Sequence, residues 1–406
     1  MAGILECIRA DESAGDWAEE LHRALWAQEE SINARVYIRP LIHLNKCYIE
    51  ELPDKLLANI FNEVVTDSSR DILSSVRTNR RFHDLAIPLL YRCLELLPGR
   101  SREDMQSLGL SFRRHPERRG YAREAKLHGG SDKPRSLGQF PVLFSRDAFP
   151  NIKRLHGIRV AVTDLQNLAA VGGASTGTST IEELVFEDSD ISPAGLDALM
   201  SACKVVRKLV LHWGQGNAES PRDGEYLNEA MGAAIARHAA TIDTLEFNPD
   251  GTQIGTAPEN QPRSLKDQLA SFMVLKDLTI HLACFSGGDI SSSTVNTELM
   301  AERRFYDFLP TCLERLALIG EPDQPTNGQS AETRRKNASL RTEFTMFFNE
   351  CGPAGRFSRM REVQFPGWVD DPNQGCDGDV LPELKVLASQ ANVSIAFKGK
   401  ALSCEH

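Results

Sequence analysis

The chain has 406 residues, of which 41% are hydrophobic and 25% are charged, and its formal net charge is −10. These fractions are ordinary for a globular protein, and the length suits two or three domains. No run of 18 apolar residues occurs, and the first apolar patch is soon followed by Arg9, Asp11 and Glu12, unlike a secretory signal. We therefore expect no membrane partner and a cytoplasmic or nuclear location.

Residues 1–47 form a leader that we expect to be partly helical or mobile. Trp17, Leu21 and Leu25 place a modest apolar stripe on a helix from Asp16 to Glu30. The residues around Pro40 are expected to be extended or irregular.

Residues 48–96 predict three short helices. Pro53 suits the first turn of a helix, because its missing N–H would have no intrahelical partner there. The apolar residues of this first helix cover about half of its circumference, which is wider than the ~100° stripe that faces a single core. They are Leu56, Leu57, Ile60, Phe61, Val64 and Val65. The first helix is therefore expected to have two apolar surfaces to cover.

A second helix, Arg70 to Val76, follows a Ser- and Asp-containing stretch that can supply its N-cap. The third helix contains Phe82 and the apolar residues up to Leu90. Pro88 is expected to kink or restart this helix, because proline removes a backbone donor. Residues 91–97 are expected to be extended.

The order and spacing of these motifs resemble the F-box. The motifs are Leu52-Pro53, Leu56-Leu57, Ile60-Phe61, Leu73-Ser74-Ser75-Val76, Arg80-Arg81-Phe82 and Leu85 through Arg92. The resemblance implies that residues 48–96 dock the small acidic Skp adaptor, and through it the cullin, of a ubiquitin ligase. It places Leu52 and Pro53 at the adaptor contact, with Leu56, Ile60, Leu73 and Tyr91 as further candidates. The alternative is an amphipathic three-helix segment of some other α-rich protein.

Positive charge is concentrated in residues 70–135, which contain 15 Lys and Arg against 8 Asp and Glu. Aromatic residues interrupt a cluster that consists of Arg113, Arg114, Arg118, Arg119 and Arg123. Such a pattern can indicate a nucleic-acid patch, but a solvated connection or a basic face near an acidic adaptor explains it as well. We do not expect nucleic-acid binding to be the main role.

Short strand-like phrases recur from residue 97 to residue 402. They begin at Leu155, Leu184, Leu209, Leu245, Leu278, Leu316, Val363 and Val393, with weaker candidates at 94–97 and 126–128. Apolar residues at helical spacing lie between them, at 196–203, 227–238, 265–273, 305–309 and 344–348. This alternation predicts a parallel sheet with crossover helices, in a curved solenoid and not a closed doubly wound sheet.

The segment Ile181 to Cys203 is similar to the repeats of leucine-rich F-box proteins. The expected fold class is therefore α/β, with an N-terminal three-helix F-box followed by an irregular leucine-rich-repeat solenoid. Leucine-rich repeats are ~20 to 29 residues long, so the later, longer spacings require insertions.

The predicted insertions all follow a strand and precede a helix. They are residues 214–224, 248–263, 286–296, 320–330 and 366–379. In a parallel solenoid they share the rim at the carboxyl ends of the strands, which is commonly a binding face. They are mostly acidic or neutral, so we expect a basic or polar substrate segment there.

No catalytic motif is evident. The glycine-rich segment 172–177 lacks the Lys-Ser/Thr of a phosphate loop, and neither a G-x-S-x-G nor an H-E-x-x-H motif occurs. The nine cysteines form no zinc-ligand spacing and are expected to be reduced thiols. We therefore expect no enzyme activity, no cofactor and no metal site.

Together these features resemble a fungal-type F-box and leucine-rich-repeat protein. That resemblance implies a substrate-recognition subunit of an SCF-type (Skp, cullin, F-box) ubiquitin ligase, in which the solenoid recruits a protein substrate. The alternatives are a non-degradative interaction scaffold and, less favoured, a nucleic-acid-binding module that uses residues 113–123.

Overall fold

The computed structural model describes residues 49, 52–67, 76, 79–97, 110–130, 134–163, 177–213, 229–248, 268–281, 304–319, 342–366 and 380–398. The chain forms two compact units. A helical unit contains the described residues up to Cys93 together with 110–122, and a sheet unit contains 94–97 and the described residues from Arg123 onward. The leader predicted at 1–47 lies outside the described residues.

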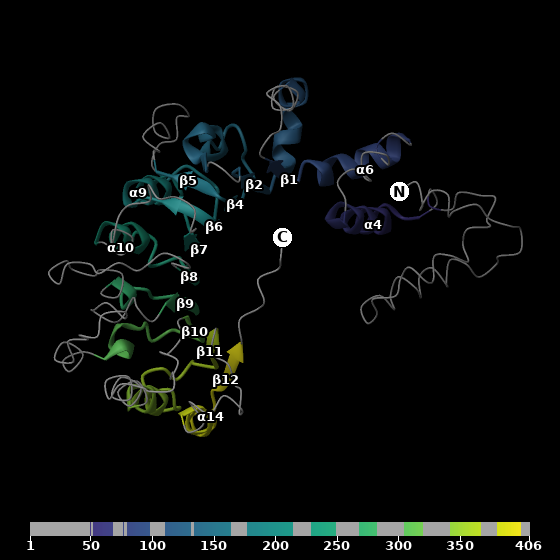
Figure 1. Cartoon of the computed structure of the whole chain (residues 1–406). Helices are drawn as coiled ribbons and strands as arrows, with labels where there is room; N and C mark the ends of the chain where they lie inside the picture. Colours follow the sequence, from purple (N-terminus) through teal and green to yellow (C-terminus); the bar gives the residue numbers. More distant parts are fainter. Residues whose placement is uncertain are drawn as a thin grey trace, which may run out of the picture. The chain divides into compact units, whose positions relative to one another are not determined.

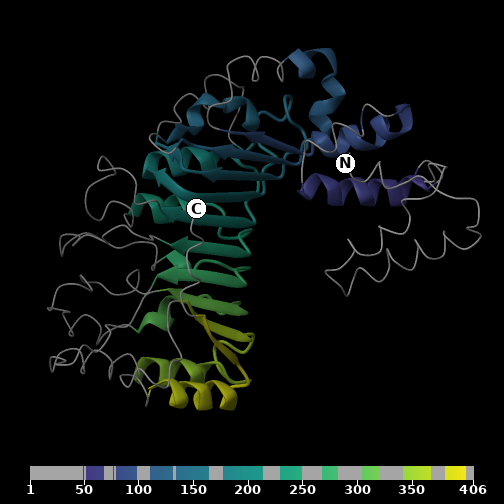
Figure 2. The same cartoon turned by 45° about the vertical axis from the view of Figure 1, so that its right-hand side comes forward.

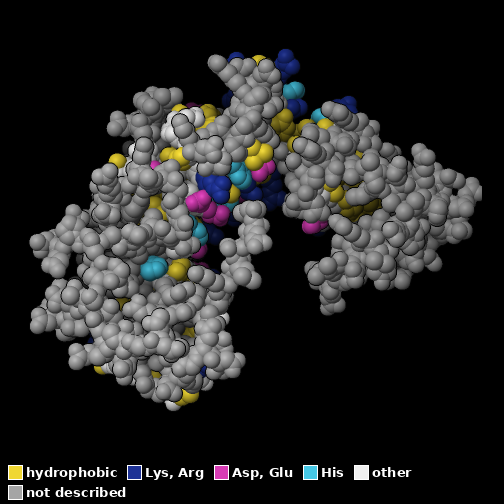
Figure 3. Space-filling view, viewed as in Figure 1, with side chains coloured by type: hydrophobic (Ala, Val, Ile, Leu, Met, Phe, Trp, Pro, Cys, Tyr) yellow, Lys and Arg dark blue, Asp and Glu magenta, His cyan; other side chains and the backbone are white. Residues whose placement is uncertain are grey.

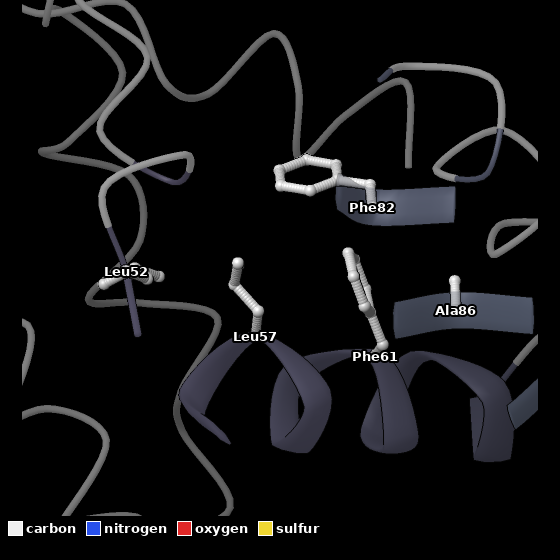
Figure 4. Close-up of a cluster of buried hydrophobic side chains, with 5 residues drawn as sticks. All are labelled: Leu52, Leu57, Phe61, Phe82 and Ala86. Atoms are coloured by element: carbon white, nitrogen blue, oxygen red, sulfur yellow. The ribbon is translucent and has the colours of Figure 1, made fainter. Parts of the chain in front are cut away.

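Two helices, α4 (Asp54–Asp67) and α6 (Arg80–Leu90), build the core of the helical unit. Leu57 and Phe61 project from α4 toward Phe82 and Ala86 of α6 (Figure 4). All four side chains are buried, and the rings of Phe61 and Phe82 meet edge to face with centroids 5.4 Å apart. Asn79 caps α6, because its side chain accepts a hydrogen bond from the N–H of Phe82 at 2.8 Å.

Of the two predicted effects of Pro88, a kink or a restart of the helix, the restart is wrong, because α6 continues to Leu90 with Pro88 inside it. Helical hydrogen bonding continues past Pro88, because the N–H of Tyr91 reaches the carbonyl of Ile87 at 3.2 Å. Of the helix predicted at 70–76, only Val76 belongs to the described residues, and it is helical.

The sheet unit contains a twelve-stranded sheet (Figure 1). Its strands are β1 (Cys93–Leu96), β2 (Glu124–His128), β3 (Arg135–Ser136), β4 (Arg154–Ile158), β5 (Val160–Val162), β6 (Glu183–Ile191), β7 (Lys208–Trp213), β8 (Thr244–Asn248), β9 (Asp277–His281), β10 (Arg315–Ile319), β11 (Glu362–Pro366) and β12 (Ser394–Lys398). The main path runs from β1 through β2, β4 and then β6 to β12, in chain order, while β3 and β5 form a short side branch.

The pairings from β2 to β12 are parallel. Strand order follows chain order without the reversal that defines a doubly wound sheet, so the prediction of an open parallel α/β arrangement is confirmed. All eight predicted strands and both weaker candidates lie in this sheet, although the last strand begins one residue after Val393.

The strands keep one register from neighbour to neighbour over their first residues, and the register between β6 and β7 shifts only after Phe186. Their second residues form a row that is buried at β4 and at every strand from β6 to β11, namely Leu155, Leu184, Leu209, Leu245, Leu278, Leu316 and Val363. One backbone contact also repeats: Lys153 and Arg154 both donate their N–H to the carbonyl of Arg123, and equivalent pairs do so at the next strands. The repeated unit is therefore a strand with a fixed amino-terminal turn.

Helices cover one face of this sheet (Figure 2). They are α9 (Pro193–Ala202), α10 (Glu229–Ala236), the single turn η9 (Phe305–Phe308), a helix at residues 342–350, and α14 (Val380–Gln390). Buried and partly exposed residues alternate along β2, β8, β9 and β11, so one face packs against the helices. We call the opposite face, which carries no helix among the described residues of this unit, the open face.

Two predicted helices differ from the structure. Of the apolar residues predicted to form a helix at 265–273, only 268–269 are helical among the described residues. Phe272 and Leu275 are instead buried in the non-helical segment that leads directly into β9. The stripe at 305–309 forms only the short turn η9. Helix α14 lies where a helix was expected after the insertion at 366–379, although no apolar stripe was named for it. No helix in the described part of the chain combines the length and the apolar character that crossing a bilayer requires.

Candidate functional site

The start of α4 is fixed by a residue from α6. Arg81 donates one hydrogen bond from its guanidinium to the carbonyl of Leu52 and another from Nε to Asp54 Oδ1 at 2.8 Å. Leu52 is 9% exposed and belongs to the buried cluster, whereas Pro53 next to it is exposed. Of the predicted Leu-Pro pair, Leu52 is therefore a core residue and Pro53 is a surface residue.

The other predicted contact residues occupy different environments. Leu56 is partly buried and lies outside the cluster, while Ile60 is partly buried and packs against it. Leu73 lies outside the described residues. Pro53, which immediately precedes α4, and Leu56 within α4 are therefore the two predicted residues whose side chains lie outside the buried cluster.

Tyr91 is held by residues from the segment that follows. Its hydroxyl lies 2.8 Å from Ser111 Oγ, and its ring centroid is 5.6 Å from that of Phe112. Arg118 donates to the same hydroxyl at 3.0 Å, and its guanidinium lies over the ring. These contacts give Tyr91 and Arg118 a structural role. Arg113 and Arg114 are exposed, so the basic stretch supplies both a partly buried structural contact and a charged surface.

The open face of the sheet combines histidines with carboxylates. His212 Nε2 lies 2.9 Å from Glu246 Oε1, and this hydrogen bond lowers the pKa of Glu246 from its usual value. His156 Nε2 lies 3.2 Å from Glu187 Oε1, but without hydrogen-bonding geometry. Figure 3 shows acidic, basic and histidine side chains next to one another on the visible face of this unit. The open face is therefore polar and suited to contact another polar surface.

The amino-terminal ends of the strands carry a ladder of ion pairs. Its members are Lys153–Glu182, Arg154 Nε–Glu183 Oε2 at 2.7 Å, Arg207 Nε–Glu182 Oε2 at 3.3 Å, and Arg315–Asp277. The hydrogen bond from Lys153 is the main reason that the pKa of Glu182 is lowered. Because each pair joins neighbouring strands, the ladder matches opposite charges in the native register. We call this edge the amino edge.

The predicted binding rim lies at the opposite edge. Strands β7 to β11 end at Trp213, Asn248, His281, Ile319 and Pro366, and the predicted insertions follow or begin there. Apart from Asn248 and Pro366, these insertions lie outside the described residues. Their acidic character and substrate preference stay predictions.

The described side chains do not form a metal cluster. No three His, Cys, Asp or Glu residues among them gather as metal ligands would. Burial raises the pKa of the Cys203 thiol to about 12 and, as the larger of two causes, that of Cys351 to about 12. Both thiols are thus poor nucleophiles at neutral pH, as expected of cysteines that pack in a core.

A scan against models of protein families finds none that matches this chain, and a search of curated proteins finds no similar protein.

Proposed function

We propose that the helical unit is an F-box that docks a Skp-type adaptor, and that the sheet unit is a leucine-rich-repeat solenoid that recruits a protein substrate. The chain would then be a non-catalytic substrate receptor of an SCF-type ubiquitin ligase. The observation that supports this most is the way in which Arg81 anchors the Leu52–Asp54 turn while Pro53 and Leu56 stay outside the buried cluster.

The helical unit has a small core and apolar side chains that lie outside this core, which suits a docking role. The buried cluster of the helical unit contains only five side chains among the described residues: Leu52, Leu57, Phe61, Phe82 and Ala86. Units with so little buried surface are often stabilised by a partner. Central apolar anchors commonly carry most of the energy of such an interface, at ~2 kcal/mol or more each.

The sheet unit supports the substrate-recruiting half of the proposal. Its open face presents polar side chains on a rigid parallel sheet, and surfaces of this kind recur in repeat proteins that bind other proteins. Holding adaptor and substrate on one chain raises the local concentration of substrate at the ligase, which is the mechanism proposed for ubiquitin transfer.

The test is co-purification of the full chain with a Skp-type adaptor. We expect the double variant Pro53→Ala/Leu56→Asp to lose adaptor binding while circular dichroism stays unchanged. Asn59→Asp is the matched control, because it adds the same charge to an exposed position of α4. Adaptor binding by the double variant at the wild-type level would overturn the proposal.

A second measurement separates a ligase receptor from a scaffold. Proteins that co-purify with the full chain are identified, and their half-lives are compared with and without cullin activity. A receptor shortens the half-life of at least one of them in a cullin-dependent manner, whereas a scaffold leaves all half-lives unchanged.

A further inference from the structure

The open face repeats one arrangement three times. In each case a histidine lies next to a glutamate of the neighbouring strand, and Nε2 of the ring faces one carboxylate oxygen. The pairs are His128–Glu95 at 3.5 Å, His156–Glu187 at 3.2 Å and His212–Glu246 at 2.9 Å. They join β2 to β1, β4 to β6 and β7 to β8, so they follow one another across the sheet.

The histidine rings of these pairs are partly withdrawn from water. Their side chains are between 20% and 28% exposed. The Nε2 atoms of His128 and His156 are buried and have no hydrogen-bond partner in the described part of the chain. A positive charge on such a ring strengthens its contact with the carboxylate, because charge-assisted contacts are the stronger ones. Uptake of a proton is therefore compatible with each pair.

The net charge of this part of the open face depends on the histidines. Besides Glu187 and Glu246, the third and fifth residues of β2, β4, β6, β7 and β8 include one ionised group at neutral pH, Lys126. Together with Glu95, the set carries a net charge of −2 when the histidines are neutral and +1 when all three are protonated. Histidine is the side chain that ordinarily changes charge between pH 5 and 8.

The carboxylates of the set stay ionised over this range. Glutamate ordinarily takes up its proton near pH 4.3. The hydrogen bond from His212 lowers the pKa of Glu246 further, which outweighs the opposing effect of its burial. Mild acid therefore adds positive charge to the face without removing negative charge.

The charged groups that border the set do not reverse this change. They are Glu124, Arg154, Glu183 and Lys208 at the amino ends of the strands, and Arg159, Asp188, Asp190 and His281 at the carboxyl ends. The four groups at the amino ends balance one another. Arg159 pairs with Asp188 at 2.8 Å, while Asp190 adds one carboxylate and His281 adds one further histidine. No helix of the described residues covers this face, so its charge is set by the strands.

We infer that the three pairs make the open face a proton-sensitive binding surface, which holds a basic protein segment at neutral pH and releases it in mildly acid solution. A basic segment fits because the carboxylates outnumber the single lysine and lie on successive pairs of strands (Figure 3). The inference rests on the proposed function only in placing the substrate on the sheet unit. It requires no adaptor.

The test is calorimetric titration of the full chain with an octalysine peptide in dilute buffer at about pH 7.5 and about pH 5.5. We expect binding at the higher pH and an affinity at least about fivefold weaker at the lower pH, because the added positive charges repel the peptide. Binding near pH 6.5 should also release protons, since protons and peptide oppose each other reciprocally. Titrations in two buffers of different ionisation enthalpy measure this release.

The triple variant His128→Gln/His156→Gln/His212→Gln should bind as the wild type does at the higher pH and weaken less than about twofold at the lower pH, because glutamine stays neutral. His115→Gln is the matched control. His115 Nδ1 also lies near a glutamate, 3.3 Å from Glu117 Oε1, but in the helical unit. This control should keep the full pH dependence, and circular dichroism should show that both variants are folded.

A second variant locates the peptide without changing a histidine. Glu187→Gln/Glu246→Gln should weaken octalysine binding at the higher pH about threefold or more, because it removes two negative charges. The inference is overturned if the wild type does not bind octalysine or binds it equally at both pH values. It is also overturned if the triple variant keeps the full pH dependence, if the control loses it, or if the double glutamate variant binds as the wild type does. Adaptor co-purification is measured separately, so either assignment can fail without the other.

Discussion

The helical unit gathers its core into one cluster around Phe61 and Phe82, whereas the sheet unit spreads its core along a row that recurs at each strand. In the first unit each buried side chain is a large share of the whole core. In the second, the loss of one side chain leaves the neighbouring repeats with their own contacts. The structural effect of a single defect should therefore spread through the whole helical unit but stay local in the sheet unit.

The largest effect should come from truncating the central ring of the small cluster. Phe82→Ala should cost about 3 to 5 kcal/mol, which is comparable to the whole stability of a small unit. Hydrogen exchange should then show that α4 and α6 lose protection while β6 to β10 keep theirs.

The converse variant sharpens the comparison. Phe186→Ala removes a fully buried ring from β6 and should cost a similar free energy, but it should leave the protection of α4 and α6 unchanged. If either variant unfolds both units together, the two units are not independent.

A glycine at a close backbone approach should give the next largest effect. A Cβ on Gly195 of α9 would lie 1.7 Å from the carbonyl oxygen of Val162, so Gly195→Ala should destabilise the sheet unit by about 3 kcal/mol. Gly352→Ala is the control, because the nearest atom to its added Cβ lies 3.9 Å away. Equal unfolding midpoints for the two variants in denaturant would contradict this close approach.

A smaller effect is expected at Tyr91. Tyr91→Phe removes the hydroxyl that meets Ser111 and Arg118, and should destabilise the helical unit by about 1 kcal/mol. If the hydroxyl serves structure alone, adaptor affinity measured well below the melting temperature should stay at the wild-type value. A loss of affinity without a loss of stability would instead make Tyr91 an adaptor contact.

The smallest effect concerns Asp190 at the end of β6, where burial raises the pKa of the carboxyl. A raised carboxyl pKa means that the folded state binds its proton more tightly, so the carboxylate costs stability once the pH exceeds the pKa of the unfolded chain. Asp190→Asn should therefore stabilise the protein at pH 7 by no more than about 1 kcal/mol, since the group is only half-buried. The gain should vanish as the pH falls below about 4, and a gain that persists at low pH would exclude this cause.

The sheet was predictable because its signal is repeated. In each repeat two buried apolar residues, such as Leu245 and Phe247, lie on either side of one partly exposed residue. A strand that is buried on one face requires this alternation. Strand β5 escaped prediction because only Arg159 separates it from β4. Arg159 takes the left-handed φ of 54° and makes a local kink without reversing the chain, because β4 and β5 both run parallel to β6. Such a kink leaves little trace in the pattern of apolar residues.

The sites were less predictable, because their contacts join residues distant in sequence. The burial of Leu52 depends on α6, and its carbonyl is held by Arg81, 29 residues away.

The central claim is that the helical unit, and not the sheet unit, docks the adaptor. Hydrogen exchange of the full chain with and without a Skp-type adaptor tests it most directly. The account predicts added protection in residues 52–64 at the start of α4, with no change in strands β6 to β12. Added protection confined to the strands, or no protection anywhere at saturating adaptor, would contradict it.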